Sequence, residues 1–240
     1  MENENLNYEQ LLISNQKLSR NLSELLWASI FHDSIKDSTW LKETDFCPGR
    51  WAIGYAYLYV LYRILNEAHP YSILDLGLGQ TSKMISQYVS YFPQTQHIIV
   101  ENDTSWTNFA KKSFKIKDKS KIIHLNYKME DYKNHEIRVY DNFQNTFIGK
   151  KFNLISIDAP FGADMNYYSR IDILSILPNC LEKSFIILLD DYDRSPEKNT
   201  VHDIIECLKL NNIEFYTHCY SGAKDCYIIT SPDNKWFCSL

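Results

Sequence analysis

Apolar residues recur with a helical period at the start of the chain. Between residues 5 and 30, leucines recur at helical intervals, which predicts an amphipathic helix. These leucines are Leu11, Leu12, Leu18, Leu22, Leu25 and Leu26. Residues 31–50 are more polar and end near a Cys-Pro-Gly break, so we expect a loop there. From Arg50 to Ala68, apolar and aromatic residues cover nearly all faces, which predicts a buried helix that ends before Pro70.

Beyond residue 70, short continuous apolar runs alternate with amphipathic segments. The apolar runs predict strands at Ser72–Leu76, Gln96–Val100, Lys121–Leu125, Phe152–Ile157 and Phe185–Leu189. The segments between them predict helices at 81–91, 104–114, 169–181 and 197–211, with helical or irregular chain at 127–149. Continuous apolar strands separated by helices are typical of a parallel sheet that is covered on both faces. We therefore expect an α/β fold of the Rossmann-like, doubly wound kind.

The last part of the chain breaks this alternation. Two strand-like runs, Ile213–Tyr220 and Cys226–Thr230, are joined only by Ser221–Asp225, which is too short for a crossover helix. The pair must form an antiparallel hairpin, so the predicted sheet is mostly parallel and seven-stranded, with N-terminal helices outside it. We divide the chain into a helical cap or dimerisation segment, 1–49, and a sheet-containing domain, 50–240.

The first predicted strand ends in an acid and a glycine-rich turn. Asp75, Gly77, Gly79 and Ser82 follow the spacing D-x-G-x-G-x-x-S. The glycines permit a sharp turn and a close ligand approach, and the next helix points its first N–H groups at that ligand. An acid before the glycines would repel a pyrophosphate, whereas it suits an amine, a sulfonium or sugar hydroxyls. Glu101 ends the second strand, about 20 residues further on, where a carboxylate can accept two ribose hydroxyls.

The stretch ILDLGLGQTS resembles motif I of class I S-adenosylmethionine (SAM) methyltransferases. The resemblance implies SAM as the cofactor, a class I methyltransferase domain over residues 50–240, and a sheet that closes with a reversed strand. It assigns the cofactor to these residues: Asp75, Gly77, Gly79, Ser82 and Glu101. In such enzymes adenine lies after the third strand, where Glu130 is the predicted contact. The methionine end lies near the position of Arg50 and Trp51.

Acids also end the fourth and fifth predicted strands. Asp158 and the pair Asp190-Asp191 should face one crevice, because adjacent strands are about 5 Å apart. Desolvated carboxylates at that distance repel unless they share a proton or a cation, and a divalent cation such as Mg²⁺ would relieve the conflict. Two other interpretations stay open: Asp158 as a metal-free general base, and Asp191 as a cap of the following helix.

The same aspartates resemble the metal ligands of the catechol-O-methyltransferase-like branch. This resemblance implies that Asp158, Asp190 and Asp191 bind a divalent metal that chelates substrate oxygens. In that branch a lysine base follows the strand-four aspartate, whereas Ala-Pro-Phe-Gly follows here, so the base is unassigned. Further candidates for the acceptor site are Lys224 and the pair Arg170 and Asp172, which could instead bind each other.

The composition and charge of the chain limit the kinds of partner that we expect it to bind. The net charge is −5 with mixed signs along the chain, which argues against nucleic acid. The longest apolar run, Trp51–Tyr62, is too short to span a bilayer. The six cysteines have no metal-ligand spacing and the first residues are polar, so we expect a cytoplasmic protein with free thiols. The expected partners are a small polar acceptor and a second copy bound through the N-terminal helices.

The leading hypothesis is SAM-dependent O-methylation. The chain is similar to bacterial methyltransferase-like proteins that carry PGRWAIGY, ILDLGLGQ and IDAPFG, and this resemblance implies a sugar or sugar-nucleotide acceptor from surface-polysaccharide pathways. One alternative is an NAD-dependent oxidoreductase, which Glu101 fits but Asp75 and the terminal hairpin do not. Another is a non-catalytic methyltransferase-like subunit that stabilises a partner.

Overall fold

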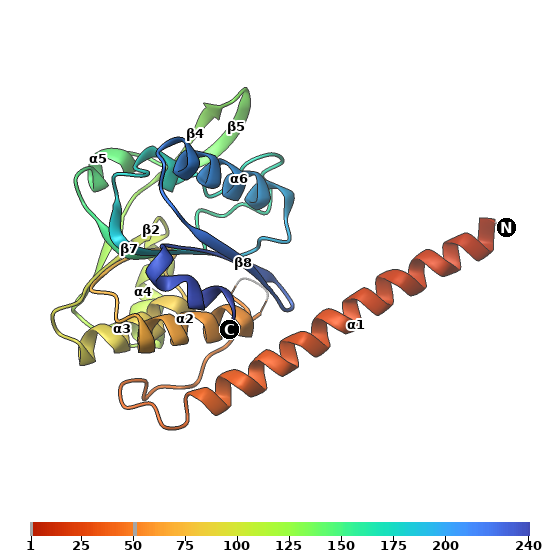
Figure 1. Cartoon of the computed structure of the whole chain (residues 1–240), viewed down its shortest axis with the longest axis horizontal. Coiled ribbons are helices and arrows are strands. Elements are labelled where there is room, and N and C mark those ends of the chain that lie inside the picture. Colours follow the sequence, from red (N-terminus) through yellow and green to blue (C-terminus); the bar gives the residue numbers. More distant parts are fainter. Residues whose placement is uncertain (1, 50–51) are drawn as a thin grey trace.

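A seven-stranded sheet forms the centre of the molecule (Figure 1). The computed structural model describes residues 2–49 and 52–240. The strand order is β3-β2-β1-β6-β7-β9-β8, and β9 runs in the opposite direction to the other strands of this sheet. The strands are β1 (Ser72–Leu76), β2 (Gln96–Glu101), β3 (Ser120–His124), β6 (Phe152–Ile157), β7 (Leu181–Leu189), β8 (Tyr216–Ser221) and β9 (Asp225–Thr230). This topology confirms the predicted Rossmann-like sheet with a terminal antiparallel hairpin.

Helices cover both faces of the sheet, because alternate strand residues point to opposite sides. Ile73 packs in the apolar cluster under α2 and α3, whereas Leu74 and Leu76 pack in the cluster under α5 and α6. The helices of the domain are α2 (Tyr55–Glu67), α3 (Gln80–Tyr91), α4 (Thr104–Ser113), α5 (Phe143–Phe147) and α6 (Ser195–Leu210). The chain closes with a 3₁₀ helix, η2 (Pro232–Cys238).

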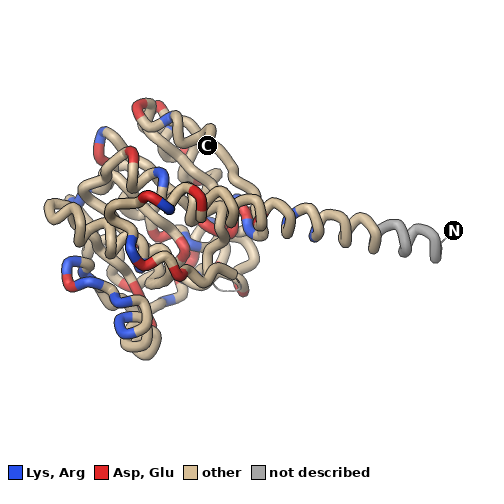
Figure 2. Tube along the Cα trace, turned by 90° about the horizontal axis from the view of Figure 1, so that it is seen from below, with Lys and Arg blue, Asp and Glu red and all other residues tan. Residues whose placement is uncertain are grey.

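The second half of the first helix, α1 (Glu2–Ser34), attaches it to the body (Figures 1 and 2). Glu24 accepts hydrogen bonds from the backbone N–H groups of Tyr55 and Ala223, and Phe31 is completely buried. The residues after α1 also enter this core, since Trp40 packs against α2 and α3. Residues 31–49 are therefore part of the folded body.

A short two-stranded ribbon takes up residues 127–140 of the segment 127–149, for which helical or irregular chain was predicted, and the short helix α5 lies in the remainder. The ribbon consists of β4 (Tyr127–Tyr132) and β5 (His135–Tyr140), joined by Lys133 and Asn134 in left-handed backbone conformations. Two such residues in succession are characteristic of a tight hairpin turn. The prediction was wrong because most of β4 is exposed, so its sequence has no apolar alternation.

The helix predicted at 169–181 is also absent, and a single 3₁₀ turn, η1 (Asp172–Ser175), takes its place. The apolar spacing is helical there, but Arg170 adopts a positive φ of 57°, which an α-helix cannot contain. Pro178 then ends any helix, because it lacks an N–H group and restricts the residue before it. Strand β7 consequently begins four residues earlier than predicted, at Leu181.

Within the described part of the chain, no helix combines the length and the apolar character needed to cross a bilayer.

Candidate active site

A cavity of about 490 Å³ lies at the carboxyl ends of the central parallel strands. It lies where the strand order reverses, between β1 and β6, which is the usual ligand position in a doubly wound sheet. One end is formed mainly by Gly77, Gly79, Glu101, Trp106 and Tyr127, and we name it the glycine end. The other is formed mainly by Asp158, Arg170, Asp191, Arg194 and Lys224, and we name it the charged end.

The glycine-rich turn has the geometry that its sequence predicts. Gly77 has a φ of +106°, and a Cβ atom there would lie 3.0 Å from the Cβ of Ala159, so any other residue would be strained and crowded. Around Gly79 no heavy atom lies within 4 Å of such a Cβ position, so the backbone here is open to a ligand. The turn leads directly into α3, whose first N–H groups adjoin the cavity.

The side chain of Asp75 stabilises this turn through hydrogen bonds. Its carboxylate is completely buried and accepts hydrogen bonds from the hydroxyls of Thr81 (3.2 Å), Ser82 (2.5 Å) and Ser156 (2.8 Å). Ser82 in turn accepts the Gly79 N–H at 3.2 Å. Asp75 and Ser82 are absent from the cavity wall. Their predicted contact with a cofactor is therefore indirect, through the shape of the turn.

Glu101 lies on the cavity wall beside the turn. One carboxylate oxygen, Oε1, accepts the N–H groups of Asn102 (2.7 Å) and Asp103 (2.9 Å). The other, Oε2, accepts the N–H of Leu78 at 3.2 Å and no second donor from the described residues, which leaves a lone pair for a ligand. The side chain is thus fixed in position and still able to accept a ligand hydroxyl.

One predicted contact does not reach this cavity, and another falls on residues that the structure does not describe. Glu130 lies on β4, pairs with Lys128, and lines a different cavity under the β4–β5 ribbon. Its assignment to adenine rested on a wrong structure for residues 127–149, and Tyr127 and Trp106 line the cavity instead. Arg50 and Trp51 lie outside the described residues, although their neighbours Gly49 and Ala52 contribute to the wall.

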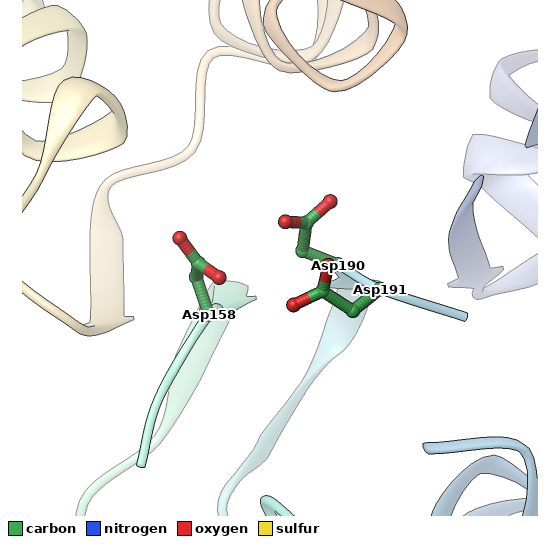
Figure 3. Close-up of side chains that lie close together, drawn as sticks. All are labelled: Asp158, Asp190 and Asp191. Atoms are coloured by element: carbon green, nitrogen blue, oxygen red, sulfur yellow. The ribbon is translucent and has the colours of Figure 1, made fainter. Parts of the chain in front are cut away.

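The three predicted acids do converge at the ends of β6 and β7 (Figure 3). Each of Asp158, Asp190 and Asp191 offers an oxygen within 4.8 Å of the others. The parallel pairing of β6 with β7 produces this convergence, because the backbone N–H of Asp190 bonds to Ile157 just past the paired residues. An oxygen cluster of this kind has the chemistry that Mg²⁺ prefers.

Three cationic side chains already neutralise this cluster. Arg170 lies 3.1 Å from Asp158 and 2.7 Å from Asp191. Lys224 lies 3.1 Å from Asp191 and 3.4 Å from Asp190. Arg194 contacts Asp191 at 2.7 Å. Every aspartate therefore has a cationic partner from the chain itself, and both oxygens of Asp191 are engaged.

The pKa values of the aspartates diverge because their surroundings differ. Burial raises the pKa of Asp158 to about 6, although Arg170 opposes the shift. Burial and the neighbouring Asp158 raise the pKa of Asp190 well above its ordinary value. Burial also acts on Asp191, but the charges of Arg170, Lys224 and Arg194 outweigh it and hold the pKa below the usual range. At neutral pH, Asp191 is therefore ionised and Asp158 is mostly ionised. Asp190 is the aspartate of the three that is most easily protonated.

Arg170 is held by contacts from two further elements. Its guanidinium donates to the backbone oxygen of Asp190 at 3.0 Å and lies 3.8 Å from the buried carboxylate of Glu197 on α6. Arg170 and Asp191 both have left-handed backbones, with φ values of 57° and 59°. Conformations of this kind cost about 1 kcal/mol or more, and they concentrate at functional sites.

Sequence reasoning missed part of the charged end. Arg194 and Glu197 were not identified, because a basic and an acidic residue near the start of a predicted helix are ordinary. Arg170 and Asp172 do not bind each other: Arg170 enters the charged end, whereas Asp172 lines the cavity under the ribbon. Lys224 reaches the crevice, as one of the interpretations expected.

Proteins of known structure share this fold, although no protein-family model and no curated protein sequence matches the chain. A Klebsiella pneumoniae protein described as a candidate O-methyltransferase has a TM-score of 0.51 at 11% identity, covering 87% of this chain and 89% of the other. A Podospora anserina methyltransferase with S-adenosylhomocysteine (SAH) bound has a TM-score of 0.48 at 12% identity, covering 92% and 94%. Thermotoga maritima spermidine synthase has a TM-score of 0.47 at 13% identity, covering 73% and 59%. The chain has the fold of the class I methyltransferases.

Proposed function

We propose that the chain is a SAM-dependent methyltransferase that methylates an oxygen atom of a small polar acceptor. One observation carries this proposal: a single cavity joins the glycine turn and Glu101 to a half-buried Asp158 whose charge is partly neutralised by Arg170. A cofactor held at the glycine end would thus lie next to a group that can accept a proton. Methyl transfer to a hydroxyl needs both of these features in one space.

The residues of the glycine end fit SAM. Glu101 has acceptor capacity for ribose hydroxyls, and Gly79 leaves open space beside its backbone. Leu78, Trp106 and Tyr127 supply the apolar and aromatic wall that an adenine ring requires. When bound, SAM supplies a methyl group activated by a positively charged sulfur.

Asp158 is the proposed general base. With its pKa raised to about 6, it is mostly ionised at neutral pH and still basic enough to take the hydroxyl proton. Arg170 fixes one of its oxygens at 3.1 Å and leaves the other for the acceptor. Arg170 and Lys224 also keep the crevice close to neutral, so that the proton transfer creates no large excess of charge.

We propose that this chemistry proceeds without a divalent metal. The donor atoms of the aspartates suit Mg²⁺, but Arg170, Arg194 and Lys224 engage both oxygens of Asp191 and one oxygen each of Asp158 and Asp190. A metal would have to displace at least two of these cations, and it would gain little charge compensation in exchange. The residues present therefore fit the metal-free interpretation better than the metal site.

A direct binding experiment tests the cofactor. Isothermal titration should show binding of SAM and of SAH, its demethylated product, and the Glu101→Ala variant should lose it. NAD, titrated in parallel, should give no heat of binding. The exposed change Asp118→Ala, in the turn before β3, serves as the control and should bind as the wild type does. Failure of the wild type to bind SAM or SAH at millimolar concentration would contradict the proposal.

The acceptor is proposed to be a sugar or sugar nucleotide, because of the resemblance to proteins associated with surface polysaccharides. Transfer of a labelled methyl group from SAM to a panel of sugars, sugar nucleotides and catechols tests this choice. Labelling of a sugar hydroxyl supports it. Labelling of catechols alone would replace it with the other acceptor class.

We further propose that α1 pairs with the α1 of a second copy. Along α1, the exposed residues Leu11, Leu18 and Leu25 are seven residues apart and therefore lie on one stripe. Leu22 lies beside this stripe and is also exposed. Sedimentation velocity should give a dimer for the wild type and a monomer after Leu11, Leu18 and Leu22 are changed to Ser. Lys17→Gln, an exposed change on the same helix, is the control and should stay dimeric. A monomeric wild type would contradict the proposal.

A further inference from the structure

A second cavity, of about 580 Å³, lies between the β4–β5 ribbon, η1 and α6. We name it the ribbon cavity. It shares no lining residue with the active-site cavity. The ribbon is tied down at its rim, because Tyr132 and Lys133 donate hydrogen bonds to Asp203 on α6 at 2.9 and 2.6 Å. The space is of the size that holds a drug-sized molecule.

The wall of the ribbon cavity is apolar in its depth and acidic overall. Ile137, Val139 and Leu174 contribute apolar surface. Around them are five acidic side chains and only two lysines. Both lysines are already engaged in ion pairs, Lys128 with Glu130 and Lys133 with Asp203. Glu206 pairs with Lys209 outside the wall, so Asp131 and Asp172 are the wall acids that have no cationic partner within the described part of the chain.

Asp172 is the most deeply buried of these acids, with 3% of its surface exposed. Its Oδ1 accepts the backbone N–H of Tyr140 at 2.7 Å. Its Oδ2 has no hydrogen-bond partner among residues 2–49 and 52–240. A buried carboxylate oxygen without a partner costs free energy, which a ligand donor can recover. Burial raises the pKa of Asp172 to about 7, in agreement with a carboxylate that lacks a cation.

We propose that the ribbon cavity binds an organic amine with an apolar body, whose ammonium group pairs with the carboxylate of Asp172. The apolar body packs against Ile137, Val139 and Leu174. The acidic rim attracts the cation and disfavours anions. This site is separate from the proposed methyl transfer and does not depend on it.

The test uses 2-phenylethylamine as the probe and 2-phenylethanol, nearly identical in shape but neutral, as its partner. Titration of the full ¹⁵N-labelled chain is followed through backbone amide signals. The amine should shift the Tyr140 amide, which reports on Asp172, and the alcohol should bind about tenfold more weakly or worse. Equal binding of both compounds would overturn the proposal, and so would amine shifts confined to Gly77 and Gly79.

Two variants locate the site. Asp172→Asn keeps an acceptor for the Tyr140 N–H and removes the charge, so amine affinity should fall about tenfold or more. Glu136→Gln, an exposed change on the same ribbon that lies outside the cavity wall, is the matched control and should bind the amine like the wild type. Leu174→Trp fills the cavity and should abolish the Tyr140 shift even if Asp172→Asn folds poorly. Unchanged amine affinity in Asp172→Asn and Leu174→Trp would overturn the proposal.

Discussion

The two ends of the active-site cavity are held together by different interactions. At the glycine end, the buried carboxylate of Asp75 accepts hydrogen bonds from three hydroxyl groups, and these bonds hold the turn in shape. At the charged end, acids from β6 and β7 are balanced by Arg170, Arg194 and Lys224. We therefore expect pH to act mainly on the charged end, where burial raises the pKa of Asp158 to about 6. This division suits a cavity that holds a cofactor firmly and moves a proton at its other end.

The largest expected effect comes from removing the base of the charged end. Asp158→Asn keeps the size of the side chain but cannot accept the acceptor's proton, so kcat should fall on the order of 10²-fold or more. SAH affinity should stay close to that of the wild type, because Asp158 does not support the glycine turn. Steady-state kinetics together with titration calorimetry measure both quantities. A variant that loses SAH binding in proportion to its activity would show that Asp158 acts at the glycine end instead.

The pH profile sharpens the same comparison. Since burial raises the pKa of Asp158 to about 6, the carboxylate becomes protonated as pH falls through that value, and kcat should fall with it. SAH affinity should vary little over the same range. In Asp158→Asn the acidic limb of the activity profile should disappear from the residual rate. An unchanged limb in this variant would assign the titration to another group.

The next largest effect concerns the fold of the glycine end. Asp75→Ala leaves the hydroxyls of Thr81, Ser82 and Ser156 without their buried acceptor, and each costs roughly 1 kcal/mol. The free energy of unfolding should therefore fall by about 3 kcal/mol, and SAH binding should weaken strongly because the turn loses its support. Urea unfolding and calorimetry measure the two effects. Asp118→Ala is the control for loss of a carboxylate, and it should leave both unchanged.

The same contrast explains how much could be predicted from the sequence. The glycine end is encoded by contiguous residues, Asp75 to Ser82, whose spacing predicts a turn between a strand and a helix. The sheet order and the convergence of Asp158 with Asp190 were also predicted from the sequence, because runs of apolar residues show where the strands end. The spacing did not show that the carboxylate of Asp75 points away from the cavity, because spacing does not determine the direction of a buried side chain.

The charged end could be predicted only in part. Arg170 reaches it from a segment that resembles a helix in its apolar period but is broken by a positive φ and by Pro178. Lys224 reaches it from the β8–β9 turn, about 30 residues beyond Asp191 in the chain. The ribbon cavity was missed entirely, because exposed β4 has no strand pattern and the prediction for Glu130 depended on it. Contacts made between distant segments depend on tertiary packing, which local patterns do not record.

A smaller effect is expected for the ligand-facing acid of the glycine end. Glu101→Gln loses the charge and one acceptor oxygen, so SAH affinity should fall about tenfold. The free energy of unfolding should fall by about 1 kcal/mol, less than in Asp75→Ala, because the Leu78 N–H loses its acceptor. Asp103→Asn keeps the helix cap of α4 and is the matched control. Equal ratios of binding loss to stability loss in Glu101→Gln and Asp75→Ala would mean that Glu101 only supports the turn.

The smallest expected effect is that of a chelator. Since Arg170, Arg194 and Lys224 already compensate the aspartates, EDTA and millimolar Mg²⁺ should both leave the wild-type kcat unchanged. In Lys224→Ala, Asp190 and Asp191 lose a cation, and Mg²⁺ should then restore part of the lost stability because its charge replaces that of the ammonium group. Thermal unfolding with and without Mg²⁺ measures this gain, and the wild type measured in parallel should show none. Loss of wild-type activity in EDTA with recovery in Mg²⁺ would mean that a metal displaces these cations during turnover, and the charged end would then be a metal site.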